Sequence, residues 1–167
     1  LQELNSVYGS TQFTGLKNED VTLTDITISA TYDVSYLNNL DGYTSGIVNA
    51  GTLTTISGFL SDLLTSYQAG GITNLGNEAI TLKDANTVAA SDLTTLAALN
   101  STGTLDSGSV ATITGSADEI IAVYSNSTIT KPLDVALTVN SGTVSVNQSR
   151  TCLLYTSDAA DDHLGVD

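Results

Sequence analysis

The chain contains an internal repeat, and this repeat restricts its fold more than any other feature. The segment 21–25 recurs at 80–84, and the segment 53–58 recurs at 110–115. Recurrence at a nearly fixed period is typical of architectures in which similar units stack on one another. We therefore divide the chain by its copies. The divisions are 1–20 as the tail of a preceding repeat, 21–79 as repeat 1, 80–135 as repeat 2, 136–150 as a partial unit or β-hairpin, and 151–167 as a terminal tail.

Each copy contains two successive patterns of a strand followed by a helix. Alternation of Val, Leu or Ile with Thr or Ser is typical of half-buried strands, and it occurs at 21–25, 53–58, 80–84 and 110–115. Apolar residues at helical spacing follow, as in Leu63, Leu64 and Tyr67. Short second strands are expected at 47–50, 72–75 and 104–106. The sequence thus predicts an α/β fold, a solenoid-like stack of strand, turn, strand and short helix.

The helix boundaries are also marked in the sequence. Ser116 and Glu119 have the spacing of a capping box, in which each side chain accepts a hydrogen bond from a free backbone N–H. Gly42, Gly70 and Gly71 follow predicted helices, and we expect them to form left-handed C-terminal caps. The pattern changes at residues 136–147, where two alternating runs flank Asn-Ser-Gly. That arrangement predicts a β-hairpin.

One strand with its following helix cannot bury enough apolar surface to fold alone. Ordering each residue costs roughly 1 to 2 kcal/mol of backbone entropy, whereas a buried aliphatic side chain contributes about 1.5 to 3 kcal/mol. Neighbouring units must therefore share a core. The predicted core residues are Val21, Leu23, Leu37, Leu40, Leu53, Ile56, Leu63, Leu64, Ile80, Leu82, Leu96, Leu99, Val110, Ile113, Ile120 and Ile121.

The last residues differ from the rest of the chain. They contain its single Cys, Cys152, and its single His, His163. Residues 152–162 resemble the translation of a sequencing-adapter read-through, so we expect the native sequence to stop near Arg150. The alternative is a genuine disordered acidic terminus.

Composition excludes several functions. The chain has 18 acidic and 4 basic residues and a formal net charge of -14, so it should be repelled by nucleic acids and anionic lipids. No apolar run approaches the roughly 20 residues of a membrane span. We expect a folded chain that binds no nucleic acid and inserts into no membrane.

The residue types also argue against catalysis. Nucleophilic Ser or Cys sites need a general base, and the only His lies in the doubtful tail. Asp118 and Glu119 are adjacent at a helix start, where capping explains them better than a glycosidase carboxylate pair does. We therefore predict no enzyme, no catalytic residues and no organic cofactor.

Calcium is the one ion that the composition allows, because the chain offers oxygen ligands and almost no Cys or His. Asp25 and Asp84 occupy the same phase of the repeat, so stacking would align them. They are the candidate calcium ligands, and helix capping or turn formation is the competing interpretation. Tyr8, Tyr67 and Tyr124 likewise recur at one phase. We expect them to pack at helix ends, and a sugar-binding stripe is the alternative.

The segments 21–25, 53–58, 71–84 and 110–119 carry a resemblance. They are similar to the Thr/Ser/Ala-rich repeats of giant cell-surface proteins of marine bacteria, cyanobacteria included, over residues 1 to about 130. The resemblance implies a very long, secreted, Cys-poor protein with a role in adhesion, surface coating or motility. It carries no catalytic residue over to this chain.

Together these features predict a structural or adhesive segment of a large repeat protein, located outside the cell or at the cell surface. Its partners would be the neighbouring repeats of the same chain, and beyond them surface polysaccharide or other cell-surface proteins. One alternative is a repeat protein that binds or degrades polysaccharide. A phage fibre segment is a further alternative.

Overall fold

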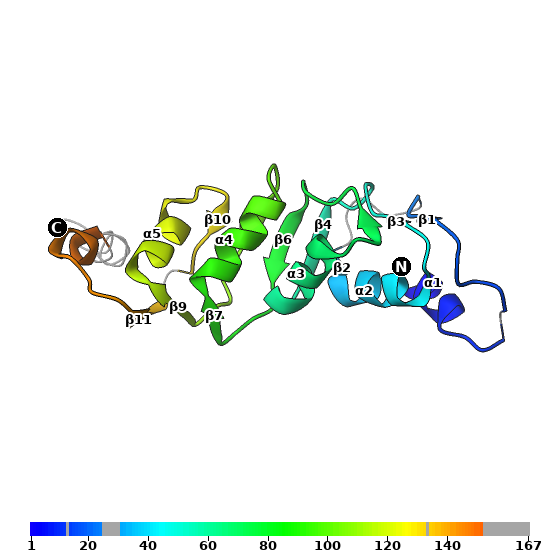
Figure 1. Cartoon of the computed structure of the whole chain (residues 1–167), viewed down its shortest axis with the longest axis horizontal. Coiled ribbons are helices and arrows are strands. Elements are labelled where there is room, and N and C mark those ends of the chain that lie inside the picture. Colours follow the sequence, from blue (N-terminus) through cyan, green and yellow to red (C-terminus); the bar gives the residue numbers. More distant parts are fainter. Residues whose placement is uncertain (13, 25–30, 133, 152–167) are drawn as a thin grey trace, which may run out of the picture.

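The computed structural model describes residues 1–12, 14–24, 31–132 and 134–151. Within these residues, five helices follow one another along the long axis of an elongated molecule (Figure 1). They are α1 (Gln2–Tyr8), α2 (Val34–Tyr43), α3 (Leu60–Gln68), α4 (Ala90–Leu99) and α5 (Ala117–Ser125). Each helix contacts the next one in the chain, and residues 146–151 add a further helical turn beyond α5. None of the described helices is long and apolar enough to cross a membrane.

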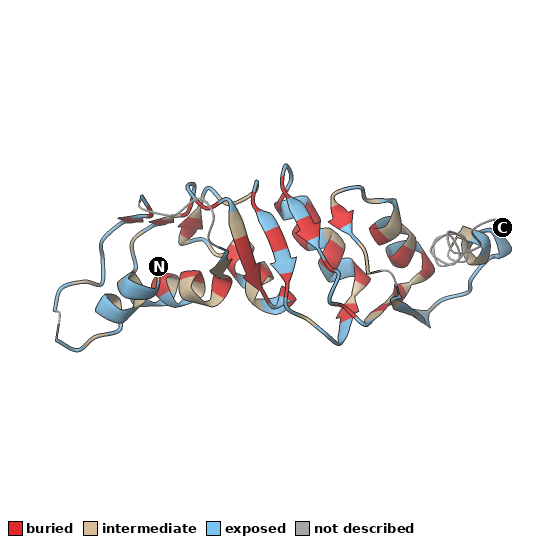
Figure 2. Cartoon of the chain, turned by 180° about the vertical axis from the view of Figure 1, so that it is seen from behind, coloured by how far each residue is buried: buried red, intermediate tan, exposed pale blue. Residues whose placement is uncertain are grey.

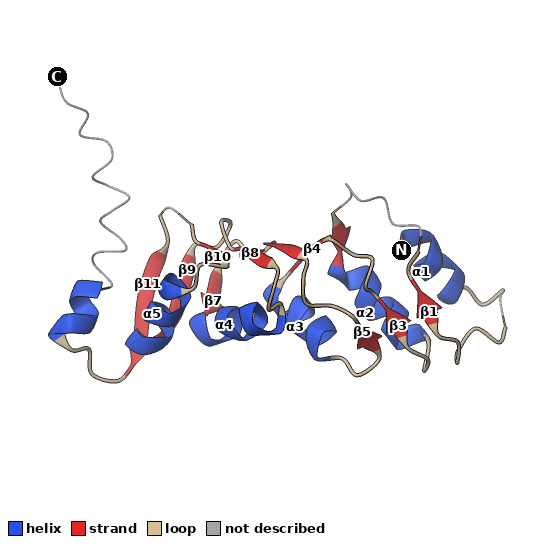
Figure 3. Cartoon of the chain, turned by 90° about the horizontal axis from the view of Figure 1, so that it is seen from above, coloured by secondary structure: helices blue, strands red, loops and turns tan. Residues whose placement is uncertain are grey.

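The strands form three parallel sheets, which we name the first, central and last sheets. The first contains β1 (Val21–Thr22), β3 (Val48–Asn49) and β5 (Ile72–Thr73). The central sheet contains β2 (Tyr32–Asp33), β4 (Thr55–Gly58), β6 (Ala79–Leu82), β8 (Thr104–Asp106) and β10 (Ile129–Thr130). The last sheet contains β7 (Thr87–Ala89), β9 (Thr112–Ser116) and β11 (Ala136–Ser141). Figure 3 shows the first and last sheets at opposite ends of the molecule.

The pairing register advances by a nearly constant step in residue number. In the central sheet Ile56 lies opposite Ile80, and Ile80 in turn lies opposite Leu105. The last sheet repeats this step, with Val88 opposite Ile113. Parallel neighbours need a long crossover connection, and the helices provide it. The prediction of a mixed α/β fold is confirmed at this level, with parallel sheets and intervening helices.

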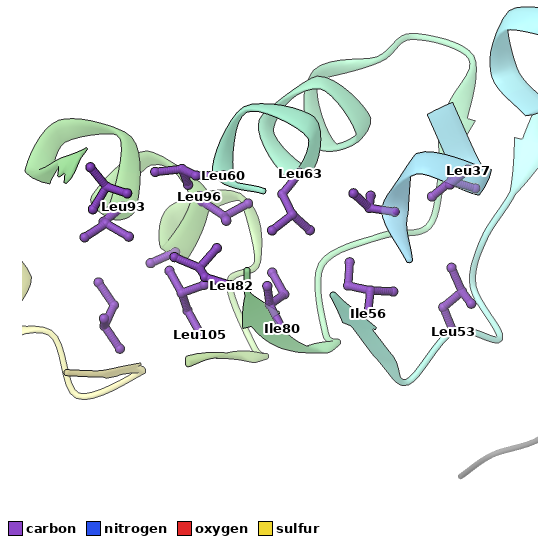
Figure 4. Packing of buried hydrophobic residues seen from close by; sticks show 14 of the residues in the cluster. Leu37, Leu53, Ile56, Leu60, Leu63, Ile80, Leu82, Leu93, Leu96 and Leu105 are labelled. Atoms are coloured by element: carbon purple, nitrogen blue, oxygen red, sulfur yellow. The ribbon is translucent and has the colours of Figure 1, made fainter. Parts of the chain in front are cut away.

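One hydrophobic core runs between the helices and the strands. Leu37, Leu63 and Leu96 extend from three successive helices toward Ile56 and Ile80 of the central sheet (Figure 4). Figure 2 shows the buried positions along the body of the molecule, from β1 to β10, while α1 and the helical turn at 146–151 have none. The predicted core is confirmed except at three positions: Leu64 and Ile121 are only partly buried, and Leu99 is exposed.

The predicted C-terminal β-hairpin is wrong. Residues 136–141 form β11, which pairs in parallel with β9, and residues 146–151 are helical. The amides and carbonyls along the free edge of β9 offer β11 a partner that the local sequence does not reveal. Strand pairing is set by such non-local partners, so the local turn signal at Asn-Ser-Gly did not determine the fold here.

Asp33 connects two distant parts of the chain. Its carboxylate caps α2 by accepting a hydrogen bond from the Ser35 N–H at 2.9 Å, and it forms an ion pair with Lys83. Partial burial would raise the pKa of Asp33, but the hydrogen bonds from Lys83 and Ser35 outweigh burial and lower it to about 2. The ionised form is therefore the form that the fold stabilises.

This pKa predicts a pH-dependent stability. Because the folded-state pKa lies below the ordinary value of 3.8, the contribution of Asp33 is present above about pH 4 and is lost as the pH falls toward 2. Asp33→Asn keeps a capping oxygen and removes the ion pair, so we expect it to cost at most about 1 kcal/mol at pH 7. Urea unfolding measured from pH 7 to pH 2 should show that the gap in unfolding free energy between parent and variant closes as the pH falls. A gap that stays constant would contradict the ion pair.

Candidate functional site

The structure describes one of the two candidate calcium ligands. Asp25 lies outside the described residues. Asp84 lies just after β6, and its Oδ2 accepts a hydrogen bond from the Leu60 N–H at 2.7 Å. It therefore caps α3, whose own N-cap residue, Phe59, offers no side-chain acceptor. The residues that the structure describes hold no group of three or more His, Cys, Asp or Glu placed to bind a metal.

The capping role of Asp84 predicts a specific result. Asp84→Ala should lower the unfolding free energy by about 1 kcal/mol, because the Leu60 N–H loses its acceptor. The same loss is expected with EDTA and with millimolar calcium. The check is thermal melting of parent and variant under both conditions. A melting temperature of the parent that rises with calcium, and that no longer responds in Asp84→Ala, would instead make Asp84 a ligand.

The acidic pair at α5 is explained by local structure. Glu119 Oε2 accepts a hydrogen bond from the Ser116 N–H at 2.7 Å, and the Ser116 hydroxyl accepts one from the Glu119 N–H. These bonds from Ser116 hold the pKa of Glu119 below its usual value. Asp118 instead accepts a hydrogen bond from Gln148 at 2.6 Å. The predicted capping box is confirmed, and the two carboxylates do not face each other across a cleft.

An open polar groove lies at the ends of the first-sheet strands, with a volume of about 640 Å³. Amide and hydroxyl side chains line it, among them Asn49, Asn74, Thr22 and Thr102. Asn49 Oδ1 accepts hydrogen bonds from Asn74 Nδ2 at 2.9 Å and from the Gly51 N–H at 3.1 Å. No charged side chain is among the described lining residues. The groove can hydrogen-bond a neutral polar ligand, and none of these lining side chains is a general base.

A buried polar cluster lies next to this groove. Glu78 is fully buried, and its Oε2 accepts hydrogen bonds from the Tyr67 hydroxyl at 2.6 Å and from the N–H groups of Gly76 and Asn77 at 2.9 and 3.1 Å. Asn100 is also buried and bonds both backbone groups of Glu78. Burial and the Glu78 carboxylate raise the pKa of Tyr67, so its hydroxyl stays protonated and donates.

The cluster fixes the loop that enters β6. Its carboxylate is closed off from solvent, which makes it a structural group and not a reactive one. The sequence analysis missed both Glu78 and Asn100. The repeat itself marks the position of Glu78, because Glu19 stands at the equivalent position before β1. Glu19 is exposed, however, so the repeat pattern does not predict that Glu78 is buried.

The recurrent tyrosines are also explained by packing. Tyr8, Tyr67 and Tyr124 are each partly buried against the hydrophobic core. Partial burial and the charge of Glu19 raise the pKa of Tyr8, which parallels the relation of Tyr67 to Glu78. The predicted packing at helix ends is confirmed, and these rings do not form an exposed stripe for stacking on sugars.

Comparison with known proteins gives no match. No family model, no curated protein and no solved structure is similar to this chain. The functional interpretation therefore rests on the residues and their geometry.

Proposed function

We propose that this chain is a non-catalytic spacing segment of a large extracellular or cell-surface repeat protein, in which successive turns of chain stack as a solenoid. The observation that carries the proposal is the parallel register of the central sheet. One row of paired residues crosses all five of its strands: Tyr32, Ile56, Ile80, Leu105 and Ile129. Each turn of chain, which we call a coil, thereby bonds to the next one.

The energetics support a rigid stack. Backbone hydrogen bonds between parallel strands connect each coil to its neighbours, and the helices bury their apolar faces in one continuous core. No coil has to fold alone. The resulting body is long relative to its width (Figure 1), which suits a spacer.

The surface supports a role in water outside the cell. Residues 1–150 keep 14 acidic and 4 basic side chains, and hydroxyl residues occupy many exposed strand positions. Such a surface stays hydrated and resists self-association. The resemblance to Thr/Ser/Ala-rich repeats of giant surface proteins points the same way. We propose neighbouring repeats as the principal partners.

A distance measurement tests the spacer. Dyes are attached at Thr11→Cys and Ser127→Cys, two exposed positions, after Cys152 is replaced by Ser. A stacked rod gives one narrow distance distribution that is the same at low and at high salt. A flexible acidic chain gives a broad distribution that contracts as salt screens its charges, which would contradict the proposal.

One observation favours a second function. The Asn49–Asn74 groove offers neutral hydrogen-bonding groups suited to a sugar chain, so binding of surface polysaccharide is the competing proposal. A glycan array probed with the parent and with Asn49→Ala separates the two. The spacer predicts no binding by either protein, whereas a binding module predicts a signal that Asn49→Ala weakens.

A further inference from the structure

Two strands of this structure are equivalent although they lie far apart in the chain. β6 reads Ala-Ile-Thr-Leu over 79–82, and β11 begins Ala-Leu-Thr-Val over 136–139. β4 pairs with β6 in the same register as β9 pairs with β11: Thr55 lies opposite Ala79, and Thr112 lies opposite Ala136. β11 is therefore the first strand of a third copy, as β6 is of the second.

The two strands differ in what their second edge contacts. β6 is paired on both edges, with β4 on one side and β8 on the other, where Ile80 lies opposite Leu105. β11 has β9 as its one partner among the described strands. An unpaired edge leaves backbone N–H and C=O groups free to bind another strand.

The side chains around this edge are exposed where their counterparts are buried. Val139 is 39% exposed, whereas Leu82 at the same position of β6 is 2% exposed. Val146 begins the helical turn at 146–151 and is 75% exposed, whereas Ala90, which begins α4, is fully buried. The apolar residues at this end have the pattern of a core whose next layer is not among the described residues.

A helical turn follows β11 at residues 146–151, as helices follow the strands of the earlier copies. Ser145 and Gln148 form a reciprocal capping box, with the Ser145 N–H donating to Gln148 Oε1 at 2.8 Å. Gln148 also donates to Asp118 on α5, which places the new helical turn beside its predecessor. A helix thus begins where the repeat requires one.

The sheets also show how copies connect. The strands that follow helices α2 and α3 lie in the first sheet, whereas those that follow α4 and α5 lie in the central sheet. In each copy, the strands that follow its helices lie in the same sheet as its first strand, which is β1 in the first sheet and β6 in the central sheet. By this rule, the strands that follow the helices of a third copy belong in the last sheet, on the free edge of β11.

We propose that the free edge of β11 is a docking edge for a further copy of the repeat, bound through a strand with the Thr-Leu-Asp pattern of β8. This proposal rests on the proposed function and names the partner of this strand edge. The sequence of the tail at 151–167 lacks the Thr-Leu-Asp pattern, and Asp162 stands at the position equivalent to Leu105.

The test is an insertion that supplies the missing strand. A second copy of residues 83–139 is inserted after Val139 in the full chain, so that Val139 takes the place of Leu82. Hydrogen exchange is then measured at the amides of Leu137 and Val139, which alternate with the Ala136 N–H that already donates to the Ala111 carbonyl on the β9 side. Docking predicts that their exchange slows at least about tenfold relative to the parent chain. Unchanged exchange would overturn the proposal.

A matched control separates docking from a general effect of chain length. The same insertion carries Leu105→Asp in the inserted copy only, which places a charge opposite Leu137. The protection of Leu137 and Val139 should then be lost, while that of 55–58 stays as in the parent. If residues 79–82 exchange rapidly even in the parent, the stacked architecture itself is wrong. If residues 79–82 are protected and Leu137 and Val139 are not, only the docking edge is wrong.

Discussion

Leu96→Ala is expected to lower the unfolding free energy by about 2 to 5 kcal/mol. Leu96 extends from α4 into the core between the helices and the central sheet, and it is fully buried. Truncation removes its apolar contacts and leaves a cavity in the core. Urea unfolding followed by far-UV circular dichroism measures the effect as a lower midpoint with an unchanged slope.

The control lies on the same helix. Leu99 is 37% exposed, so Leu99→Ala should cost less than about 1 kcal/mol although the substitution is chemically identical. Both leucines are in the periodic pattern of the sequence, and only the structure separates them. Equal losses for the two variants would contradict the placement of α4 against the core.

Glu78→Ala is expected to lower the unfolding free energy by about 3 kcal/mol. The substitution leaves the Tyr67 hydroxyl and the N–H groups of Gly76 and Asn77 buried without their acceptor. Each unsatisfied buried donor costs about 1 to 3 kcal/mol, and removal of the buried charge offsets part of this. Urea unfolding at pH 7 gives the measurement.

Two further variants test whether the loss of the buried acceptor causes the destabilisation by Glu78→Ala. Glu78→Gln keeps an acceptor oxygen for Tyr67, and its amide group can occupy the place of Oε1, which has no hydrogen-bond partner among the described residues. We expect a loss of about 1 kcal/mol. Glu19→Ala changes the residue of the same phase at an exposed position and should cost under about 0.5 kcal/mol. A loss for Glu78→Ala as small as that for Glu19→Ala would contradict the buried cluster.

The local elements were predictable because local chemistry determines them. The alternation of Ile80 and Leu82 with Thr gave a strand, and the Ser116–Glu119 spacing gave a helix start. The predicted glycine caps were wrong in detail: Gly42 lies within α2, and neither Gly70 nor Gly71 has a positive φ. The helices end instead on extended residues such as Ala69, whose backbone leads directly toward the next strand.

The errors share one physical origin, since they depend on partners distant in sequence. β11 pairs with β9 because β9 has a free edge, and no residue near 136–141 shows this. Glu78 is buried because Tyr67 and Asn100 close over it from two other elements. The cap of α3 comes from Asp84, which lies beyond the next two strands in the chain. The candidate site was accordingly less predictable than the fold.

Small-angle X-ray scattering of the chain in solution tests the central claim most directly. A compact domain of about 150 residues has a radius of gyration of about 15 Å. Stacked coils with one shared core predict a clearly larger radius and a pair-distance distribution with the long tail of a rigid rod. A symmetric distribution with the radius of a compact domain would contradict the account.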